Sequence, residues 1–151
     1  MNNNTTLRIL KEASSRATQN NLPYTGAVTP QEAFSLLQHH PNTQLVDVRS
    51  RAELELVGSV PNAVAIEWAF YPGMVANPDF DTQLASQLDK NTPVIFMCRT
   101  GGRSHNAAVV AQKMGFKQVF NMIEGFEGDT NTQKQRTLVN GWKHAGLPWT
   151  N

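Results

Sequence analysis

The chain has 151 residues, which is enough for one compact domain and too few for two ordinary ones. Its 40% hydrophobic and 17% charged residues are typical of a globular protein, and no apolar stretch approaches the roughly 18 residues that span a bilayer. Thirteen basic against twelve acidic residues leave a net charge of +1, which provides no field to attract nucleic acid or an anionic membrane. We therefore expect a small partner, no nucleic acid and no membrane.

Residues 1–27 are expected to form an N-terminal extension ahead of a domain that covers residues 28–151. The extension lacks the continuous apolar stretch of a secretory signal, so we expect a cytoplasmic protein. A mitochondrial transit peptide is the alternative, because basic residues stand among serines and threonines, although an acidic residue argues against it. An apolar stripe at helical spacing predicts a short helix that packs on the domain. The stripe is formed by Leu7, Leu10, Ser14 and Ala17.

The first part of the predicted domain contains one helix and two strands. "TPQEAFSLLQHH" has Thr29 as N-cap, Pro30 at the first helical position and Glu32 completing a capping box, which predicts a helix. "TQLVDV" at 43–48 and "AVAIEW" at 63–68 are rich in β-branched and apolar residues and predict strands. The segment between them is expected to be a loop with one helical turn.

The second part alternates in the same way. A turn-rich connection, "YPGMVANP", leads to a helix marked by Phe80, Leu84 and Leu88. "VIFMC" lacks polar alternation, which predicts a central strand covered on both faces. A helix from Arg103 to Met114 and a strand, "QVFNMI", follow. We expect the polar run "GDTNTQKQRT" to be a flexible loop, and the aromatic side chains of Trp68, Phe70 and Tyr71 to close the core rather than wall a site. His105 is expected to be exposed.

The alternation of strands and helices predicts an α/β domain with a mostly parallel sheet. Ligands of such sheets bind beyond the carboxyl ends of the strands. The only cysteine, Cys98, stands at the carboxyl end of the most apolar strand. The functional site is therefore expected there.

Cys98 opens the stretch "CRTGGRS". Gly101 and Gly102 allow successive backbone N–H groups to turn toward one point, and the N-terminus of the following helix directs its free N–H groups the same way. Side chains that add charge or hydroxyl donors are Arg99, Thr100, Arg103 and Ser104. The stretch predicts an anion-binding loop with a sulfur atom at its base.

Cysteines at helix N-termini beside cations have lowered pKa values, so Cys98 is predicted to be a nucleophile that forms a covalent intermediate. One alternative is a buried cysteine that only packs, and another is a phosphate-binding loop with the cysteine as bystander. The glycines and arginines after Cys98 argue against a cysteine that only packs. The spacing of the glycines argues against a phosphate-binding loop. A single cysteine forms no internal disulfide and suits a reducing compartment. The four histidines show no metal-ligand spacing, so no metal or cofactor is expected.

The loop resembles the active-site loop of single-domain rhodaneses. "LVDVRSRAELELVGSVPNAVAIEW" resembles the stretch in which these domains carry an Asp-Val-Arg triplet, and "GWKHAGLPW" resembles their closing tryptophan segment. The resemblance spans Val28 to Trp149. It implies a rhodanese-like three-layer α/β domain with a five-stranded, mostly parallel sheet flanked by helices.

The resemblance also implies that Cys98 takes a sulfane sulfur from thiosulfate or a similar small anionic donor, becomes a persulfide, and passes the sulfur to cyanide or a thiol. The donor would be bound by Arg99, Thr100, Gly101, Gly102, Arg103 and Ser104. We assign the residues that match the triplet and the acidic position, Asp47, Arg49 and Glu53, to support of the loop by charge pairing. The chain departs from the family at Ser59, where histidine is usual, and at Asn62, where glycine is usual.

Loop length separates the candidate activities. Four residues stand between Cys98 and Arg103, one fewer than in cysteine-dependent phosphatases, so the smaller ring suits a single sulfur atom. This makes a phosphatase or arsenate reductase the weaker alternative, and the basic residues favour thiosulfate over mercaptopyruvate. A third hypothesis is a persulfide carrier or sensor that hands sulfur to a protein partner, docked through the polar segment near Thr130.

Overall fold

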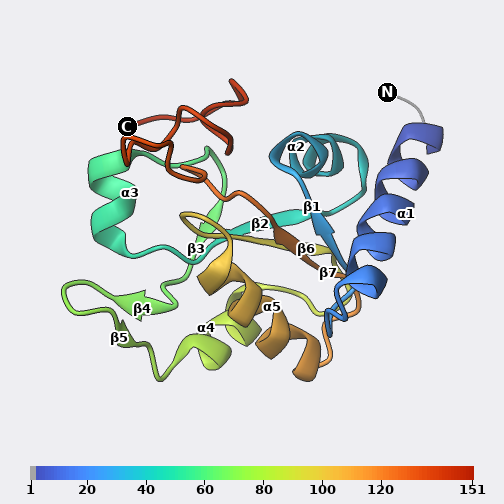
Figure 1. Ribbon diagram of the computed structural model, residues 1–151. Helices are drawn as coiled ribbons and strands as arrows, with labels where there is room; N and C mark the ends of the chain where they lie inside the picture. The colour runs from blue at the N-terminus through green and yellow to red at the C-terminus, as the bar shows by residue number, and fades with distance from the viewer. Residues whose placement is uncertain (1–2) are drawn as a thin grey trace.

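Five strands form one sheet in the computed structural model, which describes residues 3–151. The strand order is β1-β7-β6-β2-β3, and every neighbouring pair is parallel (Figure 1). The strands are β1 (Gly26–Val28), β2 (Gln44–Asp47), β3 (Val64–Ala65), β6 (Val94–Met97) and β7 (Val119–Met122). The predicted α/β fold with a five-stranded sheet is confirmed. The strand β1 is too short for a sequence pattern and was not expected.

Helices cover both faces of this sheet (Figure 1). On one face lie α1 (Asn3–Gln19) and α2 (Pro30–His39), and on the other lie α4 (Phe80–Gln87) and α5 (Gly102–Lys113). The helix α3 (Arg51–Val57) follows the carboxyl end of β2. None of the helices within residues 3–151 is both long and apolar enough to cross a membrane.

The strand β6 is the middle strand and is buried along its whole length. Successive side chains of a strand point to opposite faces. Val94 and Phe96 therefore join the core beneath α4 and α5, while Ile95 and Met97 join the core beneath α1 and α2. This explains the absence of polar alternation in the sequence, as predicted.

The buried face of α1 agrees only in part with the expected one, because Leu10 and Ala17 of the predicted stripe pack against the core and Leu7 and Ser14 do not. Ile9, Ala13 and Ala17 are buried, whereas Leu7 of the predicted stripe is 62% exposed. The contact with β1 sets the phase of the helix, because a Cβ added to Gly26 would lie 2.8 Å from Ala13. Small residues at both positions let the helix approach the strand this closely. Sequence periodicity alone does not reveal such a contact.

Capping boxes begin two of the helices. The hydroxyl of Thr29 accepts a hydrogen bond from the Glu32 N–H at 3.2 Å, and the Glu32 carboxylate accepts one from the Thr29 N–H at 3.0 Å, as predicted for α2. Ser50 and Glu53 form the same reciprocal pair at the start of α3. The predicted loop with one helical turn is therefore a longer helix, because Ser50 and Glu53 supply a second capping box.

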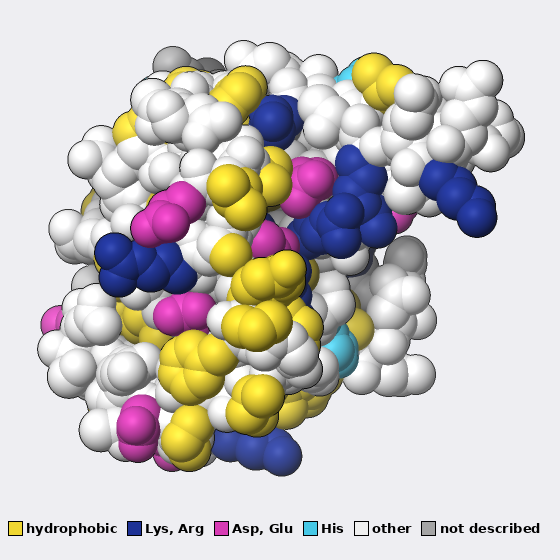
Figure 2. All heavy atoms as spheres, turned by 90° about the vertical axis from the view of Figure 1, so that its left-hand side faces the viewer, with side chains coloured by type: hydrophobic (Ala, Val, Ile, Leu, Met, Phe, Trp, Pro, Cys, Tyr) yellow, Lys and Arg dark blue, Asp and Glu magenta, His cyan; other side chains and the backbone are white. Residues whose placement is uncertain are grey.

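A small antiparallel hairpin of β4 (Ala69–Phe70) and β5 (Val75–Ala76) replaces the expected turn-rich connection. Trp68 is half-buried and packs edge-on against Phe80. The other two aromatic residues, Phe70 and Tyr71, are 39% and 66% exposed, so their placement in the core was wrong. Figure 2 shows hydrophobic side chains gathered in a stripe on the face that carries α3 and this hairpin.

The polar run that was expected to be flexible is cross-linked by its own side chains. The Asn131 carboxamide accepts hydrogen bonds from the N–H groups of Gln133 and Gln135, each at 2.9 Å. Asn140 bonds across the base of the segment to Asp129, through both its oxygen and its nitrogen. Hydrogen bonds of Asn131 within the polar run and of Asn140 just after it therefore shape this loop.

Candidate active site

The predicted loop joins the central strand to a helix at the carboxyl end of the sheet. Cys98 directly follows β6, and α5 begins at Gly102. Gly101 is the N-cap and has a φ of 113°, a conformation that favours glycine. Gly102 is exposed, has open space where a Cβ would be, and lies outside the left-handed region. Only the first of the two glycines is therefore required by backbone conformation.

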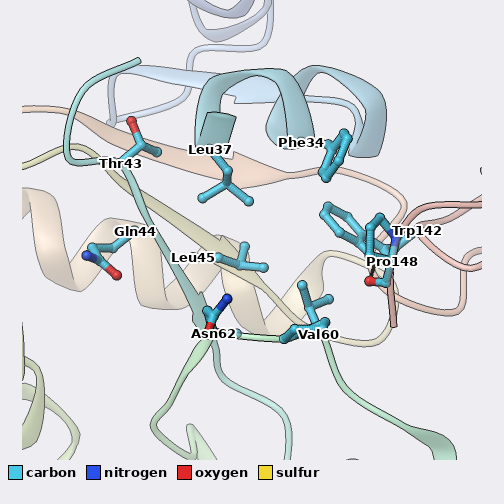
Figure 3. Close-up of a pocket in the computed structure, with 11 residues that line it drawn as sticks. Phe34, Leu37, Thr43, Gln44, Leu45, Val60, Asn62, Trp142 and Pro148 are labelled. Carbon is cyan, nitrogen blue, oxygen red and sulfur yellow. Dashed lines mark hydrogen bonds between the residues drawn. The ribbon is translucent and has the colours of Figure 1, made fainter. Parts of the chain in front are cut away.

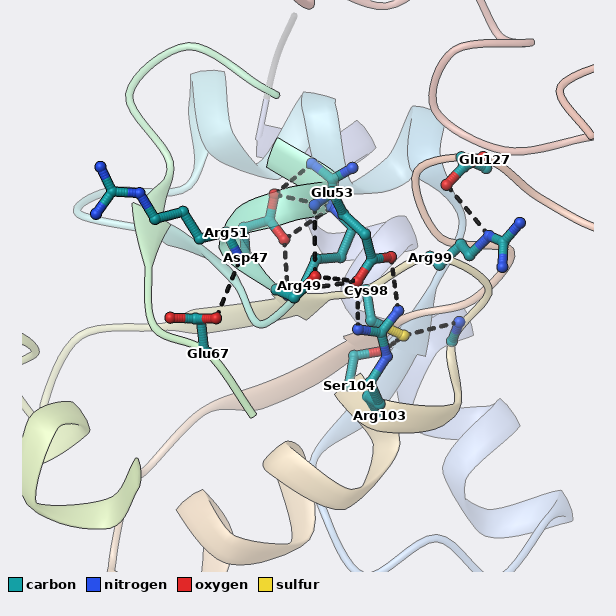
Figure 4. A network of polar contacts seen from close by, with 12 residues as sticks. Asp47, Arg49, Arg51, Glu53, Glu67, Cys98, Arg99, Arg103, Ser104 and Glu127 are labelled. Atoms are coloured by element: carbon teal, nitrogen blue, oxygen red, sulfur yellow. Dashed lines mark hydrogen bonds and ion pairs between the residues drawn. The ribbon is translucent and has the colours of Figure 1, made fainter. Parts of the chain in front are cut away.

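The sulfur atom of Cys98 lies inside the loop (Figure 4). The residue is only 1% exposed. The Gly101 N–H donates a hydrogen bond to Sγ at 3.1 Å, and the Ser104 hydroxyl donates another at 3.3 Å. Donors that converge on a sulfur stabilise negative charge on it. The arrangement suits a thiolate or a persulfide anion. Thr100 is a half-buried residue of the same loop.

The segment after β7 holds the loop from the other side. The Phe126 N–H donates to the Cys98 carbonyl at 2.9 Å, and the Glu127 N–H donates to the Arg99 carbonyl at 3.0 Å. Gly125, with a φ of 74°, allows this approach because a side chain there would collide with the Arg99 carbonyl group. No local sequence signal marks this segment as part of the site.

Arg103 forms a two-pronged ion pair with Glu53 at the start of α3 (Figure 4). The two N–O distances are 2.7 and 2.9 Å. Burial alone would raise the pKa of Glu53, but hydrogen bonds from Arg103 and Ser50 lower it to about 2. The Glu53 carboxylate in turn raises the pKa of Arg103. Both side chains are therefore charged. Their ion pair connects the start of α3 to the first turn of α5.

Arg99 also has a carboxylate partner. Its Nε lies 3.2 Å from Oε2 of Glu127, with side chains that are 46% and 11% exposed (Figure 4). Both arginines that were expected to present free positive charge are thus paired with acids. Glu127 was missed because it lies far along the chain, and no local pattern connects it to the loop.

Asp47 and Arg49 form a fully buried ion pair beneath the site. The Arg49 Nη2 donates to Asp47 at 2.7 Å and to the carbonyl of Gly58 at 2.8 Å. The guanidinium also lies over the ring of Phe126, 4.1 Å from its centroid. Because the Phe126 N–H binds the Cys98 carbonyl, the pair reaches the loop through one intermediate residue rather than by direct contact.

Two further residues at the back of the loop were not predicted. Asn121 of β7 is 5% exposed and donates from Nδ2 to the Gly101 carbonyl at 3.2 Å. The Tyr24 hydroxyl lies 2.7 Å from Nδ1 of His105, so His105 is half-buried rather than exposed as expected. Burial raises the pKa of Tyr24. These contacts tie the chain before β1 to the first turn of α5.

A separate cavity of about 410 Å³ lies between α2, the start of β2 and the C-terminal segment (Figure 3). Its lining carries no titratable side chain. The residues are Phe34, Leu37, Thr43, Gln44, Leu45, Val60, Pro61, Asn62, Ala63, Trp142 and Pro148. The charged and nucleophilic groups gather instead around Cys98.

The family model for the rhodanese-like domain matches residues 29–132. The chain belongs to the rhodanese-like domain family. The crystal structure of Rv0390 from M. tuberculosis is similar, with a TM-score of 0.78 and 37% identity over 84% of this chain and 98% of that one. The expected family and fold are thus confirmed.

Sulfurtransferases are among the similar rhodanese-like proteins. Thiosulfate sulfurtransferase GlpE of Haemophilus influenzae is 33% identical over 101 residues, which cover 67% of this chain and 84% of that protein. The solution structure of a polysulfide-sulfur transferase homodimer from Wolinella succinogenes has a TM-score of 0.59 and 25% identity, covering 97% of this chain and 88% of that one.

Proposed function

We propose that this rhodanese-like protein is a sulfurtransferase that carries sulfur on Cys98. The observation that carries the proposal is the convergence of the Gly101 N–H and the Ser104 hydroxyl on the sulfur of the only cysteine. The names of the relatives, one a thiosulfate and one a polysulfide-sulfur transferase, support the reaction class. The donor is thiosulfate or a similar small anion, and the acceptor is cyanide or a thiol.

Each half-reaction balances without a metal or redox cofactor. The Cys98 thiolate attacks the outer sulfur of thiosulfate, the S–S bond to the sulfonate breaks, and sulfite leaves with the electron pair. The product is a Cys98 persulfide anion. Cyanide then attacks the outer sulfur of the persulfide, thiocyanate leaves, and the thiolate is restored.

The remaining predicted residues take supporting roles in this proposal. The backbone from Arg99 to Ser104, including Thr100, Gly101, Gly102 and Arg103, would surround the transferred sulfur. Glu53 would hold Arg103, while Asp47 and Arg49 would hold the segment beneath Cys98. Residues 1–27 would extend the domain of residues 28–151 by adding α1 and the first two residues of β1 to it. A reducing compartment such as the cytoplasm would keep the single thiol active.

Intact mass measurement tests the proposal directly. The reduced protein is incubated with thiosulfate and then with cyanide, with Cys98→Ser as the matched control. We expect a gain of one sulfur atom on the wild type alone, removed by cyanide as thiocyanate appears. No added sulfur from thiosulfate, polysulfide or a persulfide donor would contradict the proposal. Hydrolysis of a phenyl phosphate that depends on Cys98 would point to a phosphatase.

A persulfide carrier acting on a protein partner is the second candidate. It is favoured by one observation, that both loop arginines are already paired with carboxylates and present little free charge to a small anion. Rapid loading of Cys98 by a protein persulfide, combined with slow turnover of thiosulfate, would support the carrier over the enzyme.

A further inference from the structure

Glu127 occupies a position from which it can compete with a substrate. It pairs with Arg99, whose side chain is 46% exposed and directly follows Cys98. Because Arg99 is part exposed and adjacent to Cys98 in the chain, its charge acts on an anion near the loop, and this charge is already paired with a carboxylate. The pair therefore decides how much positive charge the mouth of the loop offers.

The acid is the fixed member of this pair. The Glu127 N–H donates to the Arg99 carbonyl at 3.0 Å, and the Glu127 carbonyl accepts from the Thr137 N–H at 2.9 Å. Its side chain is only 11% exposed. Because the Arg99 side chain is the more exposed of the two, it has more room than the Glu127 side chain to turn toward another anion.

The second arginine does not compensate. Arg103 is held by two hydrogen bonds to Glu53, whose pKa of about 2 keeps it ionised at neutral pH. Two guanidinium groups next to Cys98 are therefore matched by two carboxylates. Since attraction of an anion depends on the summed field of nearby charges, a small dianion gains much less from this loop than the basic sequence suggests.

We propose that Glu127 is a specificity-determining residue, an internal anion that competes with the sulfur donor for Arg99. The proposal rests on the sulfur-transfer function of Cys98. Glu127 weakens binding of highly charged donors such as thiosulfate and leaves less charged persulfide donors nearly unaffected. Its removal should lower the KM for thiosulfate with little change in kcat.

Alkylation of Cys98 tests this field without relying on sulfur transfer. Iodoacetate carries a charge and iodoacetamide does not, and both react with the same thiolate, so the ratio of their rates reports the local field. Because the chain has one cysteine, intact mass gives both rates. We expect Glu127→Gln to raise the iodoacetate-to-iodoacetamide ratio by about three- to tenfold, an increase that salt removes.

The matched control is Asp79→Asn, which makes the same charge change at an exposed residue that forms no cap hydrogen bond at the start of α4. We expect its ratio to stay at the wild-type value. An unchanged ratio in Glu127→Gln would overturn the proposal. If Glu127→Gln folds poorly, the salt dependence of the iodoacetate-to-iodoacetamide ratio is measured on the wild type instead. A ratio that falls steeply with added salt would show that the charges around Cys98 attract anions, and this would contradict an internal competitor.

Turnover of thiosulfate separates this inference from the function on which it rests. A wild type that forms no persulfide, together with a raised alkylation ratio in Glu127→Gln, would reject sulfur transfer while keeping the charge competition. Persulfide formation with the same KM for thiosulfate in wild type and Glu127→Gln would reject the specificity role and leave the sulfurtransferase function standing.

Discussion

Three arginine–carboxylate pairs lie close to Cys98, and two of them differ strongly in burial. Beneath the loop, the side chains of Arg49 and Asp47 are 0% and 1% exposed. At the mouth, those of Arg99 and Glu127 are 46% and 11% exposed. A buried pair cannot exchange its partner for water or a ligand without a large cost, whereas a pair open to water can. The buried ion pair is therefore suited to supporting the loop, and the exposed ion pair is suited to binding an anion.

The largest effect is expected from breaking the buried pair. Asp47→Ala would leave the Arg49 guanidinium without its carboxylate inside the protein, and we expect a loss of about 3 to 5 kcal/mol in the free energy of unfolding. Urea unfolding measures it. Sulfur transfer should fall as well, because Phe126 loses its support. Unchanged stability with lost activity would instead give Asp47 a role in the chemistry.

The half-buried pair of Arg103 and Glu53 should show its contribution through pH. The pKa of Glu53 is lowered from 4.5 to about 2, so its stabilising effect is complete above about pH 5 and is lost as the pH falls toward 2. We expect Glu53→Gln to cost about 2 kcal/mol at neutral pH. Urea unfolding from pH 6 down to pH 3 would show the two proteins converging. A constant difference would contradict the ion pair.

A smaller effect is expected at the back of the loop. Asn121→Ala removes the side-chain donor to the Gly101 carbonyl, which keeps a second hydrogen bond from the His105 N–H at 3.1 Å. The cost in stability should therefore be about 1 kcal/mol. Because Gly101 also donates to the sulfur, we expect slower persulfide formation in stopped-flow assays. An unaltered rate of sulfur loading would limit Asn121 to packing.

The smallest effect should come from an ion pair that is open to water on both sides. On α3, the Nε atom of Arg51 lies 3.1 Å from Oε1 of Glu55, and the two side chains are 82% and 64% exposed. Glu55→Ala should change the free energy of unfolding by less than about 0.5 kcal/mol. A thermal melt beside that of Asp47→Ala provides the contrast. A loss comparable with the buried pair would show that burial is not what separates these sites.

The predicted parts of the site are those with local sequence signals. The loop from Cys98 to Ser104 was recognised because Gly101, Ser104 and the start of the following helix lie close together in the sequence. The partners of that loop were recognised less well. Glu53 was assigned to loop support, but Glu127 and Asn121 come from a later strand and turn, and nothing in their immediate neighbours marks them.

Local sequence signals were enough to predict the alternation of strands and helices, the central strand, the capping box at Thr29 and the turn from the cysteine into a helix. These depend on residues within a few positions of one another. Three features could be seen only in the folded chain: which face of α1 is buried, that the hairpin aromatics are exposed, and that Arg99 is paired with Glu127. Such features depend on which distant surfaces meet, because packing and charge pairing act through space rather than along the chain.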